Sequence, residues 1–331
     1  MGLLSGRIGI RALADFTNRH KKELIAELKI PKGRVPSYST FQRVITGLDF
    51  NELAAVFKEW ASQFLHEDPQ PWLAIDGKVI KGTITDAQTP YQNWVSLVSV
   101  FGVKSGIVLG AVSFESHKTN EITVVPQLIE QLGLKGAMFT LDALHCQKKT
   151  VQQIIDSEND YVIAVKGNQP SLLQAVKWVC QSEPPINSYQ DSDHSHGRRV
   201  KRLVKVYPAT DDLKNQFKGL KRFISIEREV EREGKHQTTL SYHISSLEAS
   251  ARRFAHGIVE HRGGIENRLH WVKDVVFKED ESSITAGAGP QNFSILRNIA
   301  INVFSSQGFK SMTSAIRFVA DEIPSLMKLL I

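Results

Sequence analysis

Apolar side chains near the start of the chain recur at the three- and four-residue intervals of an α-helix. Between residues 49 and 64 they are Leu53, Val56, Phe57, Trp60 and Phe64. Asp49 and Glu52 open this stripe with the spacing of a capping box, which marks the first turn of a helix. A second helical pattern covers 36–48. We therefore expect a small α-helical N-terminal domain at residues 1–68.

From Trp72 onward the apolar runs become short and rich in β-branched residues, as in strands. Strand-like runs cover 72–76, 95–102, 106–114, 137–144 and 161–167, and helical patterns cover 121–132 and 146–158. The resulting order is three strands, a helix, a strand, a helix and a strand. This order predicts a mixed α/β sheet whose parallel strands are joined by right-handed crossovers.

The second half of the chain contains a polar, β-rich stretch at about 182–248, followed by helical patterns. In the first of these patterns an apolar stripe repeats at helical spacing through Ile265, Leu269, Val272 and Val276. Another helical pattern begins at Asn292. We therefore expect a second domain at 69–331, an α/β fold with flanking helices into which the β-rich stretch is inserted.

The composition is that of a globular protein with a mild positive charge. Of 331 residues, 41% are hydrophobic and 23% are charged, which excludes a disordered chain. Lys and Arg number 41 against 35 Asp and Glu, and the net charge of +6 favours an anionic partner. Between residues 194 and 222, nine Lys and Arg stand against two Asp, so this stretch holds the whole excess. The residues predicted to contact nucleic-acid phosphates are Arg198, Arg199, Lys201 and Arg202, with a solvated surface as the alternative.

The sequence also argues against a membrane or secreted protein. No apolar stretch approaches the length of a membrane-spanning helix. Arg7 and Arg11 interrupt any apolar core of a signal peptide. Cys146 and Cys180 have neither metal-ligand spacing nor the density of a disulfide framework. We expect a soluble, cytoplasmic protein that makes no membrane contact.

Two aspartates each end an otherwise apolar strand. Asp76 closes the run WLAID, and Asp142 closes the run FTLD. A carboxylate buried alone in a sheet is costly, whereas one at the carboxyl end of a strand projects into the crevice where α/β sheets bind ligands. Two such ends predict an acidic pair. The alternative is that each Asp opens a turn or caps the next helix.

A third carboxylate, Glu266, lies at the edge of the apolar stripe in the helical pattern that follows residue 250. Arg262 and His270 stand one helical turn to either side of it, and Lys273 follows on the same flank. From these residues alone, a solvated helix face with an ion pair is the preferred interpretation.

The order of strand Asp, strand Asp and helix Glu resembles that of the DDE transposases of the H-repeat-associated insertion-sequence group. The blocks that carry the resemblance, in order, are AIDGKVIKG, HKTNEI, LDALHCQK, YVIAVKGNQP, HGRR, GIENRLHWVKDVVFKED and NFSILRNIAINVF. In this group the catalytic domain has the ribonuclease H-like fold. The resemblance assigns Asp76, Asp142 and Glu266 to the DDE positions. Arg262 and Lys273 match the flanking Arg and Lys of a wider signature, and the resemblance makes both of them expected DNA contacts.

The resemblance implies a transposase that cleaves DNA and transfers strands at insertion-sequence ends. The three carboxylates would supply hard oxygen ligands for two Mg²⁺ or Mn²⁺ ions, with Asp76 as the bridging ligand. The implied partners are double-stranded DNA, as transposon ends and target, and further copies in an oligomer on that DNA. The cytoplasmic protein would be nucleoid-associated when bound to DNA. Three lysines beside strand ends are further expected phosphate contacts, with ordinary surface lysines as the alternative: Lys78, Lys81 and Lys166.

The chain departs from the group at two places. Val259 stands where the wider signature has Tyr, and Gly263 or Gly264 stands where the group has Trp. Because the group's members begin with an additional apolar helix, we also expect this chain to be short at its N terminus. We therefore expect a folded, metal-binding protein that nicks DNA weakly and fails at strand transfer. The alternatives are a decayed or non-mobile DNA-binding protein that keeps the fold, and a host nuclease without strand transfer.

Overall fold

The computed structural model describes residues 1–65, 68, 70–89, 91–195, 197–319 and 322–330, without the side chains of Ser195 and Arg262. It divides into two compact units. Unit 1 comprises Met1–Glu67, Gly77–Val124 and Gly264–Ile331, and unit 2 comprises Asp68–Asp76 and Val125–Gly263. The chain passes between the units inside strand β1 (Trp72–Val79), inside helix α5 (Glu121–Leu132) and just after helix α9 (Ala251–His261). Each unit is therefore described by itself.

Unit 2 is built on a mixed sheet. Its strand order is β1, β4 (Met138–Leu141), β5 (Asp160–Val165), β9 (Lys235–Ser245), β8 (Arg222–Arg232), β7 (Arg198–Pro208) and β6 (Asn187–Ser195). The first three strands are parallel, and the remaining pairings are antiparallel. The mixed α/β sheet predicted from the sequence is confirmed, and strands β6 to β9 lie inside the β-rich stretch expected at about 182–248.

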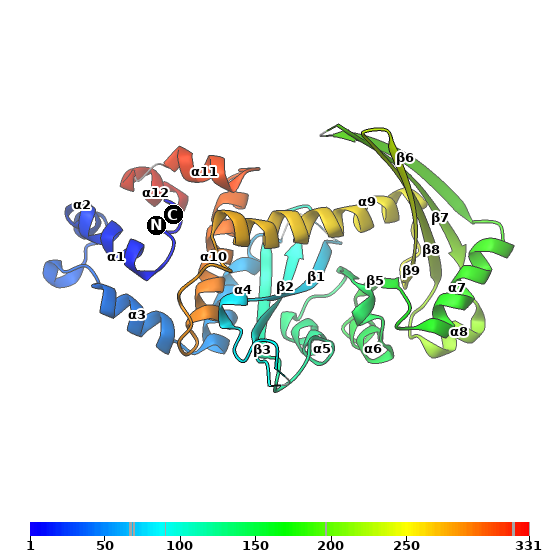
Figure 1. The fold of residues 1–331 in the computed structure, drawn as a ribbon, viewed down its shortest axis with the longest axis horizontal. Helices are drawn as coiled ribbons and strands as arrows, with labels where there is room; N and C mark the ends of the chain where they lie inside the picture. Colours follow the sequence, from blue (N-terminus) through cyan, green and yellow to red (C-terminus); the bar gives the residue numbers. More distant parts are fainter. Residues whose placement is uncertain (66–67, 69, 90, 196, 320–321, 331) are drawn as a thin grey trace. The chain divides into compact units, whose positions relative to one another are not determined.

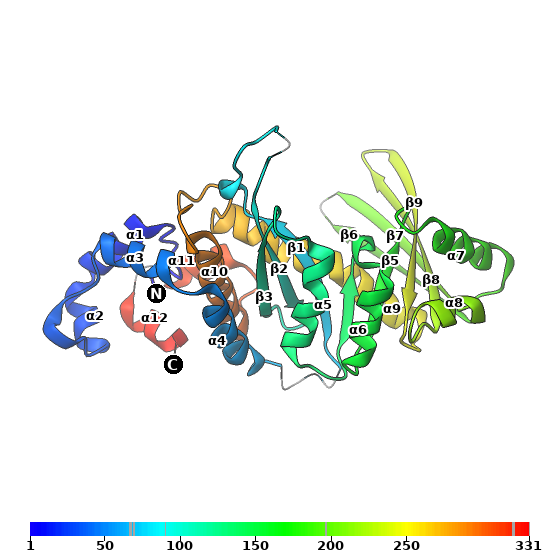
Figure 2. The ribbon, with the colours of Figure 1, turned by 90° about the horizontal axis from the view of Figure 1, so that it is seen from below.

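Helices cover both faces of this sheet. Besides α9 and the end of α5, they are α6 (Lys148–Asp156), α7 (Pro170–Ser182), α8 (Asp211–Gln216) and the 3₁₀ turn η3 (Ala143–His145). Figures 1 and 2 show α6 and α9 on opposite faces of the sheet at β4 and β5. Helix α9 buries Phe254 and Ala255 in a cluster with Val162, Val204 and Ile224 of the sheet. Burial of each large apolar side chain contributes about 1.5–3 kcal/mol, so this contact holds α9 on the sheet.

Unit 1 is organised around helix α10 (Gly289–Ser306), seen among its neighbours in Figure 1. The other helices are α1 (Ile10–Arg19), α2 (Lys21–Glu27), α3 (Tyr38–Gly47), α4 (Phe50–Ser62), α11 (Met312–Val319) and α12 (Ile323–Leu330), with 3₁₀ turns η1 (Pro31–Gly33) and η2 (Lys81–Thr83). Helix α10 packs against α3, α4, α11 and α12 and buries Phe293, Ile301 and Phe304. The antiparallel hairpin of β2 (Val95–Gly102) and β3 (Val108–Glu115) continues from the end of β1 in the order β3, β2, β1.

Helix α4 begins where the sequence predicts. The Asp49 side chain accepts hydrogen bonds from the backbone amides of Asn51 (2.8 Å) and Glu52 (3.0 Å). Phe57 is buried as expected, but Val56 is 64% exposed, so the buried stripe is narrower than predicted. Capping is decided by local sequence, whereas the width of the stripe depends on which helices pack beside it.

The helices α1 to α4 and helix α10 belong to the same compact unit. The division of the chain into domains at 1–68 and 69–331 stays a prediction. In the part of the chain that the structure describes, no helix combines the length and the apolar character needed to cross a membrane.

The long helical segment after residue 250 changes type after α9. Residues Arg262–His270 (η4) and Val272–Val276 (η5) are π-helical. Ile265 and Leu269 are buried as predicted, but Lys273, expected on an exposed flank, has only 1% of its side chain exposed. A π-helix closes i to i+5 hydrogen bonds and therefore holds more residues per turn than an α-helix. A register counted at 3.6 residues per turn is wrong for Lys273.

Candidate catalytic site and phosphate-binding surface

Asp76 and Asp142 lie on or directly after two neighbouring parallel strands of unit 2. Asp142 directly follows β4, as expected, whereas Asp76 lies inside β1, which continues to Val79 and so does not end where the sequence predicts. The last backbone pair of the two strands is Ala74 opposite Thr140, and each aspartate stands two residues beyond it. Adjacent strands are about 4.8 Å apart, so the pairing places both aspartates towards the same end of β1 and β4.

Asp142 also caps the turn that follows it. Its Oδ1 accepts a hydrogen bond from the backbone amide of Leu144 (2.9 Å) and lies 3.9 Å from Nε2 of His145. The Asp142 side chain is 47% exposed. Asp142 therefore caps a turn, as the alternative interpretation expects, and it also presents a carboxylate to solvent; its place in an acidic pair stays a prediction.

The next two residues, His145 and Cys146, are buried. Burial raises the pKa of the Cys146 thiol to about 12. The thiol therefore stays protonated near neutral pH, whereas zinc is bound by thiolates.

Two histidines lie on the face of the sheet that α9 covers. Thr140 Oγ1 and His261 Nδ1 are 2.7 Å apart, and this hydrogen bond links β4 to the end of α9. His243 of β9 is buried opposite Ala164 of β5. Burial, with smaller contributions from His261 and Lys166, lowers the pKa of His243 to about 3. The His243 imidazole is therefore neutral near pH 7.

Glu266 belongs to unit 1. It is exposed on η4, between the buried residues Ile265 and Leu269. Turns of π-helix are rare and occur frequently at functional sites, so the local structure is compatible with a functional carboxylate. The side chain of its predicted neighbour Arg262 lies outside the described residues.

Of the three predicted carboxylates, Asp76 and Asp142 belong to neighbouring strands of unit 2 or their ends, whereas Glu266 lies in the other unit. Among the residues that the structure describes, no group of three or more His, Cys, Asp or Glu side chains is arranged to hold a metal ion. The triad as one metal site therefore stays a prediction.

Lys78 and Lys273, both predicted to contact DNA, are held by carboxylates inside unit 1. Lys78 Nζ lies 2.7 Å from Asp274 and 2.8 Å from Asp280. It also lies 3.5 Å from Glu279, and only 10% of the Lys78 side chain is exposed. Lys273 Nζ lies 3.3 Å from Glu279. The predicted phosphate contact is wrong for the buried Lys273, and Lys78 is occupied by three ion pairs that sequence reasoning missed.

Glu279, fully buried, is the centre of this network. It lies 3.4 Å from Arg297 Nη1 and accepts a hydrogen bond from Ser294 Oγ (2.7 Å). Burial raises the pKa of Glu279, but the positive charges of Lys273, Arg297 and Lys78 outweigh burial and hold that pKa below its ordinary value. The carboxylate is therefore charged at neutral pH, and the network is a structural one.

Of the three lysines predicted beside strand ends, two are exposed. Lys81 Nζ lies 2.7 Å from Asp280, yet 69% of the Lys81 side chain is exposed. Lys166 is exposed directly after β5, at the same end of the parallel strands as Asp142. Contacts of Lys81 and Lys166 with phosphate stay predictions.

The basic stretch does not form one continuous row of phosphate contacts. Its first residues lie on β7, where successive side chains point to opposite faces of the sheet. Arg198 and Arg202 therefore share one face, and Arg199 and Lys201 share the other. Arg202 is also paired with Asp191 at 3.3 Å. The four predicted contacts therefore divide between two faces, and contact of each with phosphate stays a prediction.

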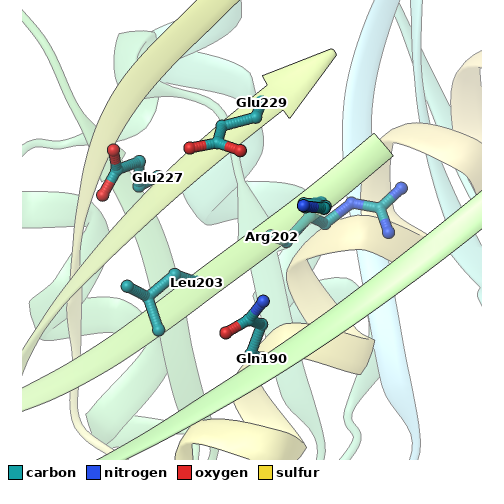
Figure 3. Close-up of a pocket in the computed structure, with 6 residues that line it drawn as sticks. Gln190, Arg202, Leu203, Glu227 and Glu229 are labelled. Atoms are coloured by element: carbon teal, nitrogen blue, oxygen red, sulfur yellow. The ribbon is translucent and has the colours of Figure 1, made fainter. Parts of the chain in front are cut away.

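A cavity of about 270 Å³ lies on the surface of β6, β7 and β8 (Figure 3). Its lining residues are Gln190, Lys201, Arg202, Leu203, Glu227 and Glu229. Lys201 lies opposite Glu229 in the register of β7 and β8. Because acids and bases both line this cavity, it does not favour an anionic ligand.

Comparison with known proteins supplies the family. The family model described as Transposase DDE domain matches residues 67–303, and the one described as DDE_Tnp_1-associated matches residues 1–61. The chain belongs to the DDE transposase family. The first matched range contains Asp76, Asp142 and Glu266, and the resemblance drawn from the ordered sequence blocks is confirmed.

Individual relatives of this transposase-family chain carry matching names. It is 34% identical over 283 residues to "Putative transposase YncI" of Escherichia coli O157:H7, covering 81% of this chain and 70% of that protein. It is 32% identical over 317 residues to "H repeat-associated putative transposase YhhI" of Escherichia coli K12, covering 92% and 82%. A solved synaptic complex of piggyBac transposase with hairpin DNA is similar with a TM-score of 0.44 and 14% identity, covering 99% of this chain and 71% of that one.

Proposed function

We propose that this chain catalyses metal-dependent DNA cleavage and strand transfer at insertion-sequence ends. The observation that supports the proposal is the parallel pairing of β1 with β4, in which Asp76 and Asp142 each stand two residues after the Ala74–Thr140 pair. We take Glu266 as the third acid, because it has the remaining place in the order of acids that the resemblance implies. Its position in an exposed π-helical turn is compatible with that role.

The donor set of the two aspartates fits divalent metal ions. Carboxylate oxygens are the hard ligands that Mg²⁺ and Mn²⁺ prefer, and Asp142 is half exposed. Asp76, Asp142 and Glu266 would hold the ions, with Asp76 as a ligand common to both. Two such ions stabilise the attacking and leaving oxygens of a phosphodiester.

Exposed cations would hold the DNA next to the carboxylates. Lys166 follows the carboxyl end of β5, and Asp142 follows the carboxyl end of the parallel strand β4. The positive charge of Lys166 suits a backbone phosphate. His243 is neutral near pH 7 and adds no charge of its own to this edge. The proposed partners are double-stranded DNA, as transposon ends and target, and further copies of the chain assembled on it. The proposed location is the cytoplasm, at the nucleoid when DNA is bound.

Substitution of Asp142 tests the proposal. Asp142→Asn removes a charged ligand at nearly constant volume, so Mg²⁺-dependent nicking of a plasmid carrying the element's ends should fall by about 100-fold or more, equivalent to about 2.7 kcal/mol of barrier. The control is Asp211→Asn on α8, whose carboxylate is 93% exposed and pairs only locally with Lys214. That variant should nick at the wild-type rate.

The outcomes separate the candidate functions. Nicking by Asp142→Asn at the wild-type rate contradicts the assignment of the site. Wild-type nicking without joining of a 3′-OH end to target DNA supports a nuclease. DNA binding by the wild type with neither reaction supports a binding protein that has kept only the fold.

A further inference from the structure

Four arginines of the β6–β9 sheet form two directly opposed pairs. In the register of β7 with β8, Arg198 lies opposite Arg232 and Arg202 lies opposite Arg228. Lys235 of β9 lies opposite Arg232 on its other side. Residues opposite each other in a sheet point to the same face, and positions two apart do as well. These five cations therefore share one face, which we call the arginine face.

The arginine face is the face of the sheet that carries Asp142. Ile224, which lies an even number of positions from Arg228, is opposite His243, and His243 is opposite Ala164. The register of β5 with β4 ends with Leu141 opposite Ile163, and one more residue along both chains leads to Asp142 and Ala164. The side chains of β7 and β8 that pack under α9 therefore point to the same face as the arginines. The arginines stand further along the same two strands.

Strand direction sets the end of the sheet at which the arginines lie. Strand β5 is parallel to β4, β9 is antiparallel to β5, and β8 is antiparallel to β9. The carboxyl end of β8, with Arg228 and Arg232, therefore points the same way as the carboxyl end of β4, where Asp142 lies. The arginines extend the sheet beyond the aspartate pair.

The opposite face is neutral by comparison, and we call it the glutamate face. Glu227, Glu229 and Glu231 lie on it, opposite Leu203, Lys201 and Arg199. Figure 3 shows Glu227, Glu229 and Leu203 around the cavity, with the Arg202 guanidinium directed away from the two carboxylates. On the glutamate face three glutamates balance Arg199, Lys201 and Lys205, whereas on the arginine face five cations stand against Asp191 and Asp193.

Such opposed arginines disfavour the folded sheet unless an anion lies between or above them. Like charges directly opposite each other in a sheet are destabilising. Asp191 pairs with Arg202, whose side chain is 12% exposed, and Glu233 lies 3.6 Å from Arg232, whose side chain is 68% exposed. By formal charge, the five cations exceed Asp191, Asp193 and Glu233 by two. The planar guanidinium fork matches a phosphate group with two hydrogen bonds.

The spacing of the pairs suits a polyanion. The two arginine pairs are four residues apart along the strands, which corresponds to about 13 Å. Each strand of B-DNA carries one phosphate per roughly 3.4 Å of helix axis, so a duplex offers several phosphates over this length. A single small anion could meet only one of the two pairs.

We propose that the arginine face holds the backbone phosphates of duplex DNA and that the glutamate face does not. The proposal rests on the proposed function for the identity of the ligand. Binding can be measured without metal and without cleavage, so the two proposals can fail separately.

The test compares two variants that each remove two positive charges from the same hairpins. Arg228→Gln with Arg232→Gln changes the arginine face, and Arg199→Gln with Lys201→Gln changes the glutamate face. The affinity of the full chain for a fluorescent duplex is measured by anisotropy in EDTA at several salt concentrations. The slope of log affinity against log salt should become shallower by about 1.8 in the first variant, at about 0.9 per lost phosphate contact, and should stay unchanged in the second.

A further variant guards against misfolding. Lys235→Gln changes an exposed residue at the tip of the arginine face, and it should make the slope shallower by about 0.9. Equal losses in the two double variants, or a loss in the glutamate-face variant alone, overturn the proposal. If wild-type protein never nicks DNA but the arginine-face variants lose slope as expected, the proposed function fails and the arginine face stands.

Discussion

Glu279 shows how a single buried charge ties distant parts of one unit together. Its carboxylate lies 3.3 Å from Lys273 and 3.4 Å from Arg297, and it accepts a hydrogen bond from the Ser294 hydroxyl (2.7 Å). Glu279 has no exposed surface. Removal of one partner from a buried ion network leaves the others as unpaired buried charges, which costs about 3–5 kcal/mol. Glu279 therefore stabilises the fold mainly because it keeps Lys273 and Arg297 from being buried without an opposite charge.

We expect Glu279→Gln to lower the free energy of unfolding by about 3–5 kcal/mol at pH 7, measured by urea denaturation. The matched control is Glu281→Gln, because the Glu281 carboxylate is 69% exposed and pairs with Lys278 at the surface, where such a pair contributes under about 1 kcal/mol. The pKa of Glu279 is lowered in the folded state, so its contribution is complete above its ordinary value of 4.5 and is lost as pH falls further. The difference between wild type and Glu279→Gln should therefore shrink below that pH. Equal losses in the two variants would contradict the role given to Glu279.

This network also marks the limit of sequence reasoning. The acidic residues after Lys273 were visible, but their partners were not, since Lys78 and Asp280 are separated by 202 positions. No local periodicity encodes a contact of that span. The position of Asp142 directly after a strand could be predicted, because a short apolar run followed by a carboxylate is a local signal, whereas strand β1 continues past Asp76 to Val79.

Strands and α-helices were predictable because their side-chain periods of two and 3.6 residues produce a local pattern of apolar and polar positions in the sequence. Strand β2 and helix α5 begin and end at the residues that the sequence indicates. The π-helices η4 and η5 were not predictable, because the apolar stripe through Ile265 and Leu269 fits an α-helix equally well. The choice depends on packing against the rest of unit 1, and it turns Lys273 inward.

Helix α9 offers a test of how closely it packs on β1. Alanine normally stabilises a helix interior relative to glycine by about 0.5–1 kcal/mol. At Gly257, however, a Cβ would lie 1.8 Å from Cζ3 of the Trp72 ring, so either the helix or the indole must move. We expect Gly257→Ala to lower the free energy of unfolding by about 1–3 kcal/mol in urea denaturation.

Gly263, six residues further along the same helical segment, provides the control. A Cβ there would meet no atom within 4 Å, so Gly263→Ala should be neutral or slightly stabilising. If both alanine variants were equally stable, the close contact between α9 and Trp72 would not exist in solution.

Over the complete chain, the net charge of +6 is far from evenly distributed. Unit 1 uses several of its cations internally, around Glu279, where they neutralise buried acids. The β6–β9 sheet instead sorts its charges by face, because strand alternation separates neighbours in sequence. The charge count of a segment therefore overstates the number of phosphates it can meet at once.

The complete chain should fold without metal and become more stable when metal is added. Asp76 and Asp142 lie outside the apolar cluster that α9 buries. Removal of metal by EDTA should therefore leave the circular dichroism spectrum unchanged. A ligand that binds only the folded state stabilises it by about 2.7 kcal/mol at 100 times its Kd. We expect Mg²⁺ to raise the Tm of the wild type accordingly, and to leave the Tm of Asp142→Asn nearly unchanged because that variant lacks one carboxylate ligand. An equal Mg²⁺-dependent rise in both proteins would mean that the ion binds elsewhere on the chain.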